Sequence, residues 1–371
     1  MKFSLSPLSV ERFLSDYWQQ KPVLIKGGLQ QFDNPLTPDD LAGLATEANI
    51  ESRVIHQTDD GWRAESGPFD NYDCYGDSHW SLVVQSVNHW VPEAQALARL
   101  FDFIPQWRFD DVMVSFAAPD GGVGPHVDNY DVFICQGSGQ RRWRVGAYGD
   151  YTEKLADEKL LHVEPFNAVI DEVVSAGDVL YIPPGFPHEG ISLDSSMSFS
   201  VGYKSVNSTE LLSGFADYLI DFATPQLLSD KQRRPARYGQ ITADDVALLQ
   251  QLLSQTLEDK NRLSDFLGIY YSQSRSELDL AEDEYDYSEW LTQFQSMPLT
   301  KLYAVKTMYL PDSIAAGVFY VDGERQQLSA PVEMLQYLCD AAVVNYEAVS
   351  DETVLRWLWE STNRGYWYFE L

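Results

Sequence analysis

Two short histidine motifs constrain this chain more than any other feature of its sequence. His126 and Asp128 are two residues apart in Gly-Pro-His-Val-Asp, and His188 ends the segment Pro-Pro-Gly-Phe-Pro-His. On a strand, a spacing of two residues puts both side chains on one face. The prolines and glycine before His188 indicate a tight turn that holds this histidine at a strand end. Two imidazoles and one carboxylate on a rigid sheet form the facial triad that binds non-haem Fe(II).

The simpler interpretation of the His-Val-Asp tripeptide is a hydrogen-bonded pair on a surface loop. The surrounding sequence favours the metal site, because a glycine-rich loop at 118–124 precedes the tripeptide and a strand-like run at 131–135 follows it. The remaining histidines, which lack acidic residues at ligand spacing, are His56, His79, His89 and His162. We expect these four to be surface or packed histidines, since most histidines are not metal ligands.

Short strand-like runs separated by Gly/Pro turns surround the two motifs between residues 105 and 205. These runs are Asp111–Phe116, Asp131–Cys135, Arg141–Val145, Val179–Ile182 and Ser196–Tyr203. The glycine-rich turn at 136–140 predicts that the second and third runs pair as a hairpin. Many short strands at this spacing are typical of a double-sheet jelly roll or a small barrel. The predicted fold is therefore mixed α/β with a mainly β core.

Helical patterns flank this β region. Ser9 and Thr37 have the features of helix N-caps, and a proline follows Thr37 at the first helical position. Helical periodicity returns at Thr209–Phe222 and at Thr242–Gly268. The acidic run Asp279–Asp286 is typical of a solvated linker. We expect three regions: 1–207, with its core at about 105–205; a helical region, 208–278; and a small α+β module, 279–371.

An apolar stripe lies within the second helical pattern. It consists of Leu248, Leu249, Leu252 and Leu253. Helical spacing alone fits either an internal core contact or the seam of a dimer.

The overall charge limits the class of partner. The 371 residues carry a net charge of -30, with a pI near 4.3. Such a surface disfavours nucleic acid and anionic membrane, and it favours a basic partner through electrostatic steering. The alternative is an acidic surface that serves solubility or salt tolerance.

Compartment and membrane association are indicated by what the sequence lacks. Three distant cysteines without a CxxC motif suggest neither zinc nor disulfides, which fits a reducing cytoplasm. We expect no signal peptide and no membrane span, because no apolar run approaches about 18 residues.

An Fe(II) oxygenase needs a second electron source, usually 2-oxoglutarate. This cosubstrate chelates the metal through its ketoacid end, and its far carboxylate needs a cation, ideally with bidentate geometry. The candidates are Arg141, Arg142 and Arg144. Strand alternation puts Arg141 on one face and the other two on the opposite face. Periodicity alone does not choose between the faces.

Together these motifs closely resemble a known family. Gly-Pro-His126-Val-Asp128-Asn-Tyr, Gly-Gln-Arg141-Arg-Trp-Arg and Gly-Asp-Val-Leu-Tyr-Ile-Pro-Pro-Gly-Phe-Pro-His188 resemble the bacterial ribosomal oxygenases, JmjC-type (cupin-like) double-stranded β-helix enzymes that hydroxylate an arginine of a large-subunit ribosomal protein. The resemblance implies His126, Asp128 and His188 as metal ligands. It also implies Arg141 as the residue that binds the far carboxylate of 2-oxoglutarate.

The resemblance further implies a slot for the substrate arginine, with an acidic partner and apolar or aromatic walls. Asp111, Met113 and Tyr130 match this slot, and Ser200 adds a hydrogen bond. Asp110 is the alternative to Asp111. Ordinary core packing is the alternative for Met113 and Tyr130, because such side chains often fill cores.

The implied activity is hydroxylation of an arginine side chain at Cβ, with Fe(II), 2-oxoglutarate and O2. The family also implies a homodimer formed through the helical region and a winged-helix-like C-terminal module. We expect a basic ribosomal protein of the large subunit as the substrate, with no direct nucleic-acid or membrane partner. The alternatives are a JmjC histidine hydroxylase, a lysine demethylase, or a cupin-like module that binds metal without turnover.

Overall fold

The computed structural model describes residues 2–231, 233–274, 280 and 284–370. The chain divides into two compact units, one ending at Ser205 and the other beginning at Val206. In the part of the chain that the structure describes, no helix is long and apolar enough to cross a membrane.

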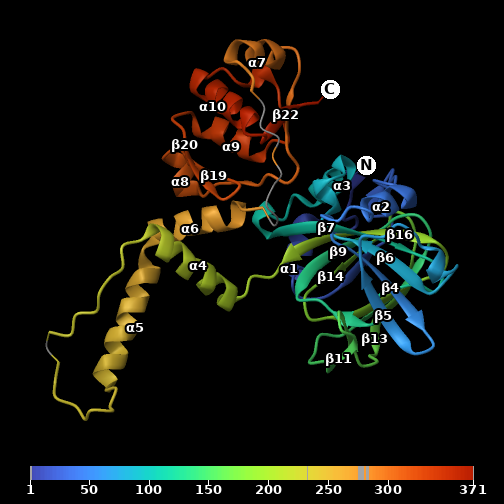
Figure 1. Ribbon diagram of the computed structural model, residues 1–371. Helices are drawn as coiled ribbons and strands as arrows, with labels where there is room; N and C mark the ends of the chain where they lie inside the picture. Colours follow the sequence, from blue (N-terminus) through green and yellow to red (C-terminus); the bar gives the residue numbers. More distant parts are fainter. Residues whose placement is uncertain (1, 232, 275–279, 281–283, 371) are drawn as a thin grey trace. The chain divides into compact units, whose positions relative to one another are not determined.

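An eight-stranded antiparallel sheet forms the centre of the first unit (Figure 1). In spatial order its strands are β2 (Val23–Ile25), β14 (Val179–Ile182), β9 (Tyr130–Gln136), β16 (Ser196–Lys204), β7 (Phe109–Ala117), β6 (Trp80–Val84), β4 (Ser52–Thr58) and β5 (Gly61–Ser66). A second sheet has the order β13 (Ala168–Val174), β10 (Arg141–Gly146), β15 (Pro187–Ser192) and β8 (His126–Val127). The two sheets form the predicted double-sheet jelly roll.

The predicted hairpin between 131–135 and 141–145 is wrong. Strand β9 lies in the eight-stranded sheet between β14 and β16, whereas β10 lies in the four-stranded sheet between β13 and β15. The glycine-rich turn bonds to neighbouring segments instead: Gly137 N donates to Met197 O, and Gln140 N donates to the Asp194 carboxylate. The turn therefore carries the chain from one sheet to the other.

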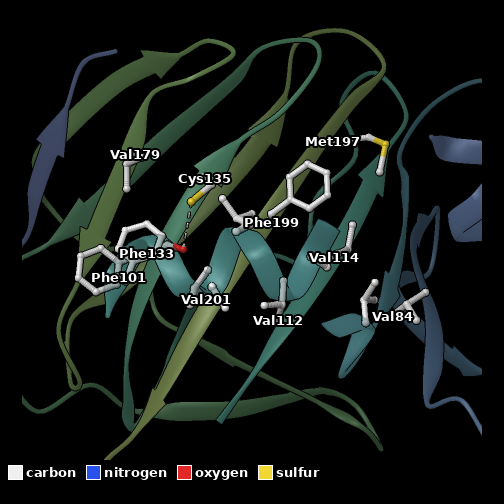
Figure 2. Packing of buried hydrophobic residues seen from close by; sticks show 14 of the residues in the cluster. Val84, Phe101, Val112, Val114, Phe133, Cys135, Val179, Met197, Phe199 and Val201 are labelled. Carbon is white, nitrogen blue, oxygen red and sulfur yellow. Dashed lines mark hydrogen bonds between the residues drawn. The ribbon is translucent and has the colours of Figure 1, made fainter. Parts of the chain in front are cut away.

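One face of the eight-stranded sheet, the core face, packs against helices. These helices are α1 (Val10–Asp16), α2 (Pro38–Leu44) and α3 (Pro92–Ala98). Figure 2 shows the apolar side chains that the sheet contributes, among them Val112, Phe133 and Phe199, which are fully buried. The predicted N-caps are confirmed, since Ser9 accepts from Arg12 N and Thr37 forms a capping box with Asp40.

The opposite face of this sheet, the cavity face, is more polar. Along β16 the side chains alternate, so that Met197 and Phe199 belong to the core face, whereas Ser198 and Ser200 line a cavity. On β9, likewise, Phe133 faces the core and Ile134 lines the cavity. Because both faces of the sheet are buried, these strands do not show a simple alternation of buried apolar and exposed polar residues.

Two small sheets complete the first unit. One is the hairpin of β11 (Glu153–Asp157) and β12 (Leu160–Val163), and the other pairs β1 (Lys2–Phe3) with β3 (Leu29–Gln30). Leu160 of the hairpin packs against Ile55 and Val83 of the large sheet. The hairpin thereby closes one side of the cavity.

The second unit begins with helices and ends in an α+β region with its own core. Its helices are α4 (Ser208–Phe222), α5 (Ala243–Glu258), α6 (Lys260–Ser272), α7 (Tyr287–Phe294), α8 (Pro311–Ala315), α9 (Val332–Asp340) and α10 (Glu352–Asn363). It has two three-stranded sheets. The first has the order β21 (Val343–Val344), β17 (Leu299–Lys301) and β22 (Trp367–Phe369). The second has the order β18 (Thr307–Met308), β19 (Val318–Val321) and β20 (Glu324–Gln327). Trp290, Phe319 and Trp367 are buried in this core. Half of the predicted acidic linker, Asp279–Asp286, lies outside the described residues.

The predicted leucine stripe lies on α5, and no α5 side chain is buried within this chain. The most exposed apolar residues of the helix are Val246, Leu249, Leu253 and Leu257. Their spacing forms one stripe along the helix.

Candidate active site

A cavity of about 300 Å³ lies between the two sheets of the first unit. Its walls come from β4, β6, β7, β9 and β16 of the large sheet, from β8, β10 and β15 of the small sheet, and from the β12 end of the hairpin. The structure places His126, Asp128, His188, Arg141, Met113, Tyr130 and Ser200 on these walls. Residues that are far apart in the sequence therefore meet in one enclosed space.

The two histidines of the predicted triad face each other across neighbouring strands. His126 of β8 and His188 of β15 are register partners, with ring centroids 4.3 Å apart. Asp128 follows β8 directly, and its Oδ2 lies 3.8 Å from Nε2 of His126 and 3.5 Å from Nε2 of His188. One potential ligand atom of each residue lies within 4.8 Å of the other two. Strand β8 ends at Val127, so Asp128 belongs to the following turn rather than to the strand as predicted.

Backbone carbonyls fix the orientation of both imidazoles. Nδ1 of His126 lies 2.9 Å from Gly124 O, and Nδ1 of His188 lies 2.9 Å from Phe186 O. A carbonyl oxygen only accepts, so each Nδ1 carries the proton and each Nε2 presents its lone pair. This arrangement is the outer support that metal-binding histidines need.

The shifted pKa values of His126 and Asp128 also suit a bound cation. Burial, and then the neighbouring His188, lower the pKa of His126 to about 4. Burial by itself would raise the pKa of Asp128, but His126, His188 and Tyr130 together lower it to about 2. Neutral imidazoles and an ionised carboxylate are the ligand forms that a divalent metal requires. The donor set of this chain therefore fits Fe(II).

Arg141 is a buried cation in a cradle of hydroxyl and carbonyl groups. Its side chain is 5% exposed, and its nitrogens donate to the hydroxyls of Ser115, Ser196 and Ser198 over 2.8–3.0 Å, and to the carbonyls of Ser115 and Ser196. None of these partners is a carboxylate, so burial lowers the pKa of Arg141 to about 10. A buried guanidinium with only neutral partners is suited to an anionic ligand.

The structure also separates the three candidate arginines. Arg141 points into the cavity, whereas Arg142 and Arg144 lie on the other face of β10 and pair with Asp171 and Glu189. The face that strand alternation alone left undecided is thus the face of Arg141.

The candidates for the substrate slot divide into two groups. Met113, Tyr130 and Ser200 line the cavity. Asp111 is absent from the cavity lining; it is buried on the same face of β7 as Met113, and its carboxylate accepts from N and Oγ of Ser86 at 2.9 and 3.2 Å. Burial is the main cause that raises the pKa of the Tyr130 phenol, and the nearby Asp111 carboxylate raises it further.

Several cavity residues were not predicted. The serines that hold Arg141 show a signal in retrospect, because Ser196, Ser198 and Ser200 alternate with apolar residues along one strand. Arg53 and Trp143 also line the cavity, yet no local pattern distinguishes them. Of the remaining histidines, His56 pairs with Glu65. His162 is buried and bonds to Val123 O.

The JmjC domain family matches residues 96–211. The ribosomal protein uL16 3-hydroxylase of Escherichia coli is 39% identical over the full length of both chains. This chain belongs to the JmjC-type ribosomal oxygenases. A probable ribosomal oxygenase of Haemophilus influenzae is 35% identical over 67% of this chain and 64% of its own length.

Solved structures agree with this family assignment. The crystal structure of Escherichia coli YcfD covers both chains completely, with a TM-score of 0.92 and 38% identity. A structure of the same ribosomal oxygenase in complex with cobalt and 2-oxoglutarate has a TM-score of 0.89. The assignment confirms the predicted JmjC fold and the predicted enzyme class, an oxygenase that uses a metal and 2-oxoglutarate.

Proposed function

We propose that this chain hydroxylates an arginine side chain, at Cβ, in a protein of the large ribosomal subunit. The observation that carries the proposal is a single cavity that contains a His-Asp-His cluster, a buried arginine in a neutral cradle and a separate wall of Met113, Tyr130 and Ser200. A full-length relative, 39% identical, is named for 3-hydroxylation of ribosomal protein uL16. Position 3 of an amino acid is its Cβ.

His126, Asp128 and His188 are the metal ligands in this proposal. When bound, Fe(II) together with 2-oxoglutarate and O2 supplies the oxidising chemistry that an unactivated C–H bond requires, and succinate and CO2 are released. The carbonyls of Gly124 and Phe186 hold the imidazoles in place. The protein contributes orientation of the substrate and exclusion of water.

Arg141 binds the far carboxylate of 2-oxoglutarate. Its guanidinium is held by Ser115, Ser196 and Ser198 before any ligand arrives, so little side-chain entropy is lost on binding. A charge-assisted pair in this dry site is stronger than a neutral hydrogen bond.

The substrate arginine lies between Met113 and Tyr130, with Ser200 as a hydrogen-bond partner. Asp111 is the acidic partner for the guanidinium. Asp110 is less suited to this role, because its carboxylate lies 3.3 Å from Nζ of Lys204. Asp111→Ala is expected to reduce hydroxylation strongly, since a cation in the slot would lose its counter-charge; full activity of this variant would exclude the assignment.

The large negative charge of the chain supports a basic ribosomal protein as the partner. Complementary potentials speed association and disfavour wrong partners. Direct binding to nucleic acid is not part of the proposal, because phosphate contacts require a basic surface. We place the enzyme in the cytoplasm, where ribosomal proteins are made.

We further propose a homodimer formed through the helical region, 208–278. The exposed stripe of Val246, Leu249, Leu253 and Leu257 supports it, because these side chains are 44–67% exposed in the single chain. Leu253→Glu should shift the mass measured by light scattering from dimer to monomer. We assign 279–371, the winged-helix-like module, a scaffold or protein-contact role.

The decisive experiment is intact-mass analysis of large-subunit ribosomal proteins incubated with and without the enzyme, Fe(II) and 2-oxoglutarate. One added oxygen, located on an arginine by fragmentation, would support the proposal. An oxygen on histidine would favour a histidine hydroxylase, and formaldehyde release would favour a lysine demethylase. Absence of 2-oxoglutarate turnover with every basic substrate would favour a metal-binding module without catalysis.

A further inference from the structure

A second cavity, of about 480 Å³, adjoins the active-site cavity. We call it the outer chamber; it is bounded by the bend at 48–51, by the adjoining ends of β4 and β5, and by Lys159 in the turn of the β11–β12 hairpin. Arg53 and Lys159 line both cavities. These two residues therefore lie between the two cavities, and we call their position the junction.

Arg53 belongs to the cavity face of the large sheet. On β4 it is the register partner of Val83 on β6, and Val83 in turn pairs with Ser115 on β7. Paired residues of neighbouring antiparallel strands share a face, so Arg53 lies in the same row as Ser115, which holds Arg141. Two strand spacings separate Arg53 and Ser115, which is roughly 10 Å.

Two buried polar atoms at this end of the cavity have no hydrogen-bond partner among the residues that the structure describes. These atoms are Nε of Arg53 and Oγ of Ser81. Ser81 is the register partner of Ile55, two residues after Arg53, so both side chains point into the same cavity. Buried donors without acceptors are unfavourable and mark a place where a ligand supplies the acceptors.

The missing acceptors are better supplied by a peptide than by 2-oxoglutarate. The cosubstrate cation, Arg141, is enclosed at the other end of the row, whereas Arg53 borders a chamber whose outer wall, the bend at 48–51, is largely exposed. Arg53 and Lys159 place two cationic side chains at the junction, which favours acceptor oxygens there. Glu51 and Glu65 also line the outer chamber, and Glu65 accepts hydrogen bonds from His56 and Tyr75.

We propose that Arg53 is a substrate-binding residue that donates hydrogen bonds to oxygen acceptors of the peptide beside the target arginine. The acceptors are main-chain carbonyls, or a carboxylate side chain if one flanks the target. In this arrangement the target side chain enters the active-site cavity and the adjoining peptide continues into the outer chamber past Lys159. Ser81 adds a further donor. The inference rests on the proposed function, because the ligand is the substrate peptide itself.

The test measures binding of a fluorescein-labelled peptide that contains the arginine located by mass analysis. Full-length enzyme is loaded with Mn(II) and 2-oxoglutarate without O2, and the peptide Kd is read from fluorescence anisotropy. Arg53→Ala should raise this Kd about tenfold or more, because a hydrogen bond to a charged group is lost in a buried site. The peptide Kd of Arg53→Lys should lie between the values for Arg53→Ala and wild type. Arg63→Ala, on the exposed side of β5, removes the same charge and should leave Kd within twofold.

Two further measurements separate the roles. Calorimetry with 2-oxoglutarate and Mn(II) should give a Kd for Arg53→Ala within twofold of wild type; a rise as large as that for the peptide would overturn the proposal and place Arg53 in the cosubstrate site. Replacing any acidic residue that flanks the target with alanine decides between a carboxylate and main-chain carbonyls.

An unchanged peptide Kd in both Arg53 variants, with wild-type thermal melting, would also overturn the proposal. If wild-type enzyme neither binds nor hydroxylates the peptide, the proposed function fails and this inference fails with it. A wild-type enzyme that hydroxylates the peptide, beside Arg53 variants that do so equally well, would refute only the role of Arg53.

Discussion

The two faces of the eight-stranded sheet belong to the same strands, yet one face buries apolar side chains and the other buries polar ones. On β16, Met197 and Phe199 are fully buried against apolar neighbours on the core face. On the cavity face of that strand, Ser196 and Ser198 are buried just as deeply but are used to hold Arg141. Buried residues therefore pack the core on one face and hold a cation on the other.

The core face gains stability from burial, because apolar surface leaves water. The cavity face gains less stability from burial. It buries a guanidinium without a carboxylate and leaves donors such as Nε of Arg53 without a partner in the described structure. A substitution on the cavity face should therefore affect ligand binding more than folding, and a substitution on the core face should affect folding more than ligand binding.

The largest effect is expected for His126→Ala. Loss of one ligand should weaken Mn(II) binding and reduce turnover by roughly a thousandfold or more, since the metal supplies several kcal/mol of the catalysis. The melting temperature should change little, because this side chain is partly exposed. Metal titration, a turnover assay and a thermal melt check this, with His56→Ala as the control. Turnover near the wild-type rate would remove His126 from the triad.

Phe199→Ala should act on folding alone. Truncation of a fully buried phenylalanine on the core face costs about 3–5 kcal/mol of the free energy of unfolding. Urea titration measures this loss. Peptide and 2-oxoglutarate affinities of the remaining folded protein should stay near wild type. Val169→Ala, at an exposed site, should change stability by no more than about 0.5 kcal/mol.

Arg141→Met should show the opposite behaviour to Phe199→Ala. The affinity for 2-oxoglutarate should fall about 100-fold, because the charged hydrogen bonds to the carboxylate are lost. The free energy of unfolding should change by no more than about 1 kcal/mol, since an unpaired buried charge is removed and Ser115 and Ser198 already bond to each other. Calorimetry measures the affinity for 2-oxoglutarate, and urea titration measures the free energy of unfolding. Arg142→Ala, on the opposite face, should leave the affinity unchanged, and a large loss of stability in Arg141→Met would contradict the contrast between the faces.

The smallest effect concerns the tyrosines of the core face. Burial raises the pKa of Tyr181 and of Tyr203 above that of a free phenol. The folded state therefore retains protons that the unfolded state loses, so stability is intact below about pH 10 and falls as the pH rises further. Tyr203→Phe should reduce this slope by up to about 1.4 kcal/mol per pH unit. Urea midpoints measured between neutral and alkaline pH provide the test, and an unchanged slope would show that Tyr203 titrates normally.

Much of the site was visible in the sequence because its signals are local. The spacing of His126 and Asp128, the Pro-Pro-Gly turn before His188 and the strand parity of Arg141 depend on neighbouring residues only. The helix caps at Ser9 and Thr37 are local for the same reason, and the structure has both.

The sequence did not predict which strands are neighbours. The runs at 131–135 and 141–145 look like a hairpin, but they lie in different sheets, because contacts with Met197 and Asp194 redirect the turn between them. Arg53 and Ser81 were missed for a related reason. Each is an ordinary strand residue until the sheet order places both on the wall of the cavity.

By itself, the sequence determined the ligand types, which strand residues share a face and the character of the surface, because these follow from residue chemistry and from the two-residue period of a strand. The tertiary structure alone decided that β10 faces β7 and β16, which brings Arg141 to its serines, and that β15 pairs with β8, which brings His188 to His126. Such contacts join residues that are distant in the chain, and they are selected by packing of the whole core rather than by any local pattern.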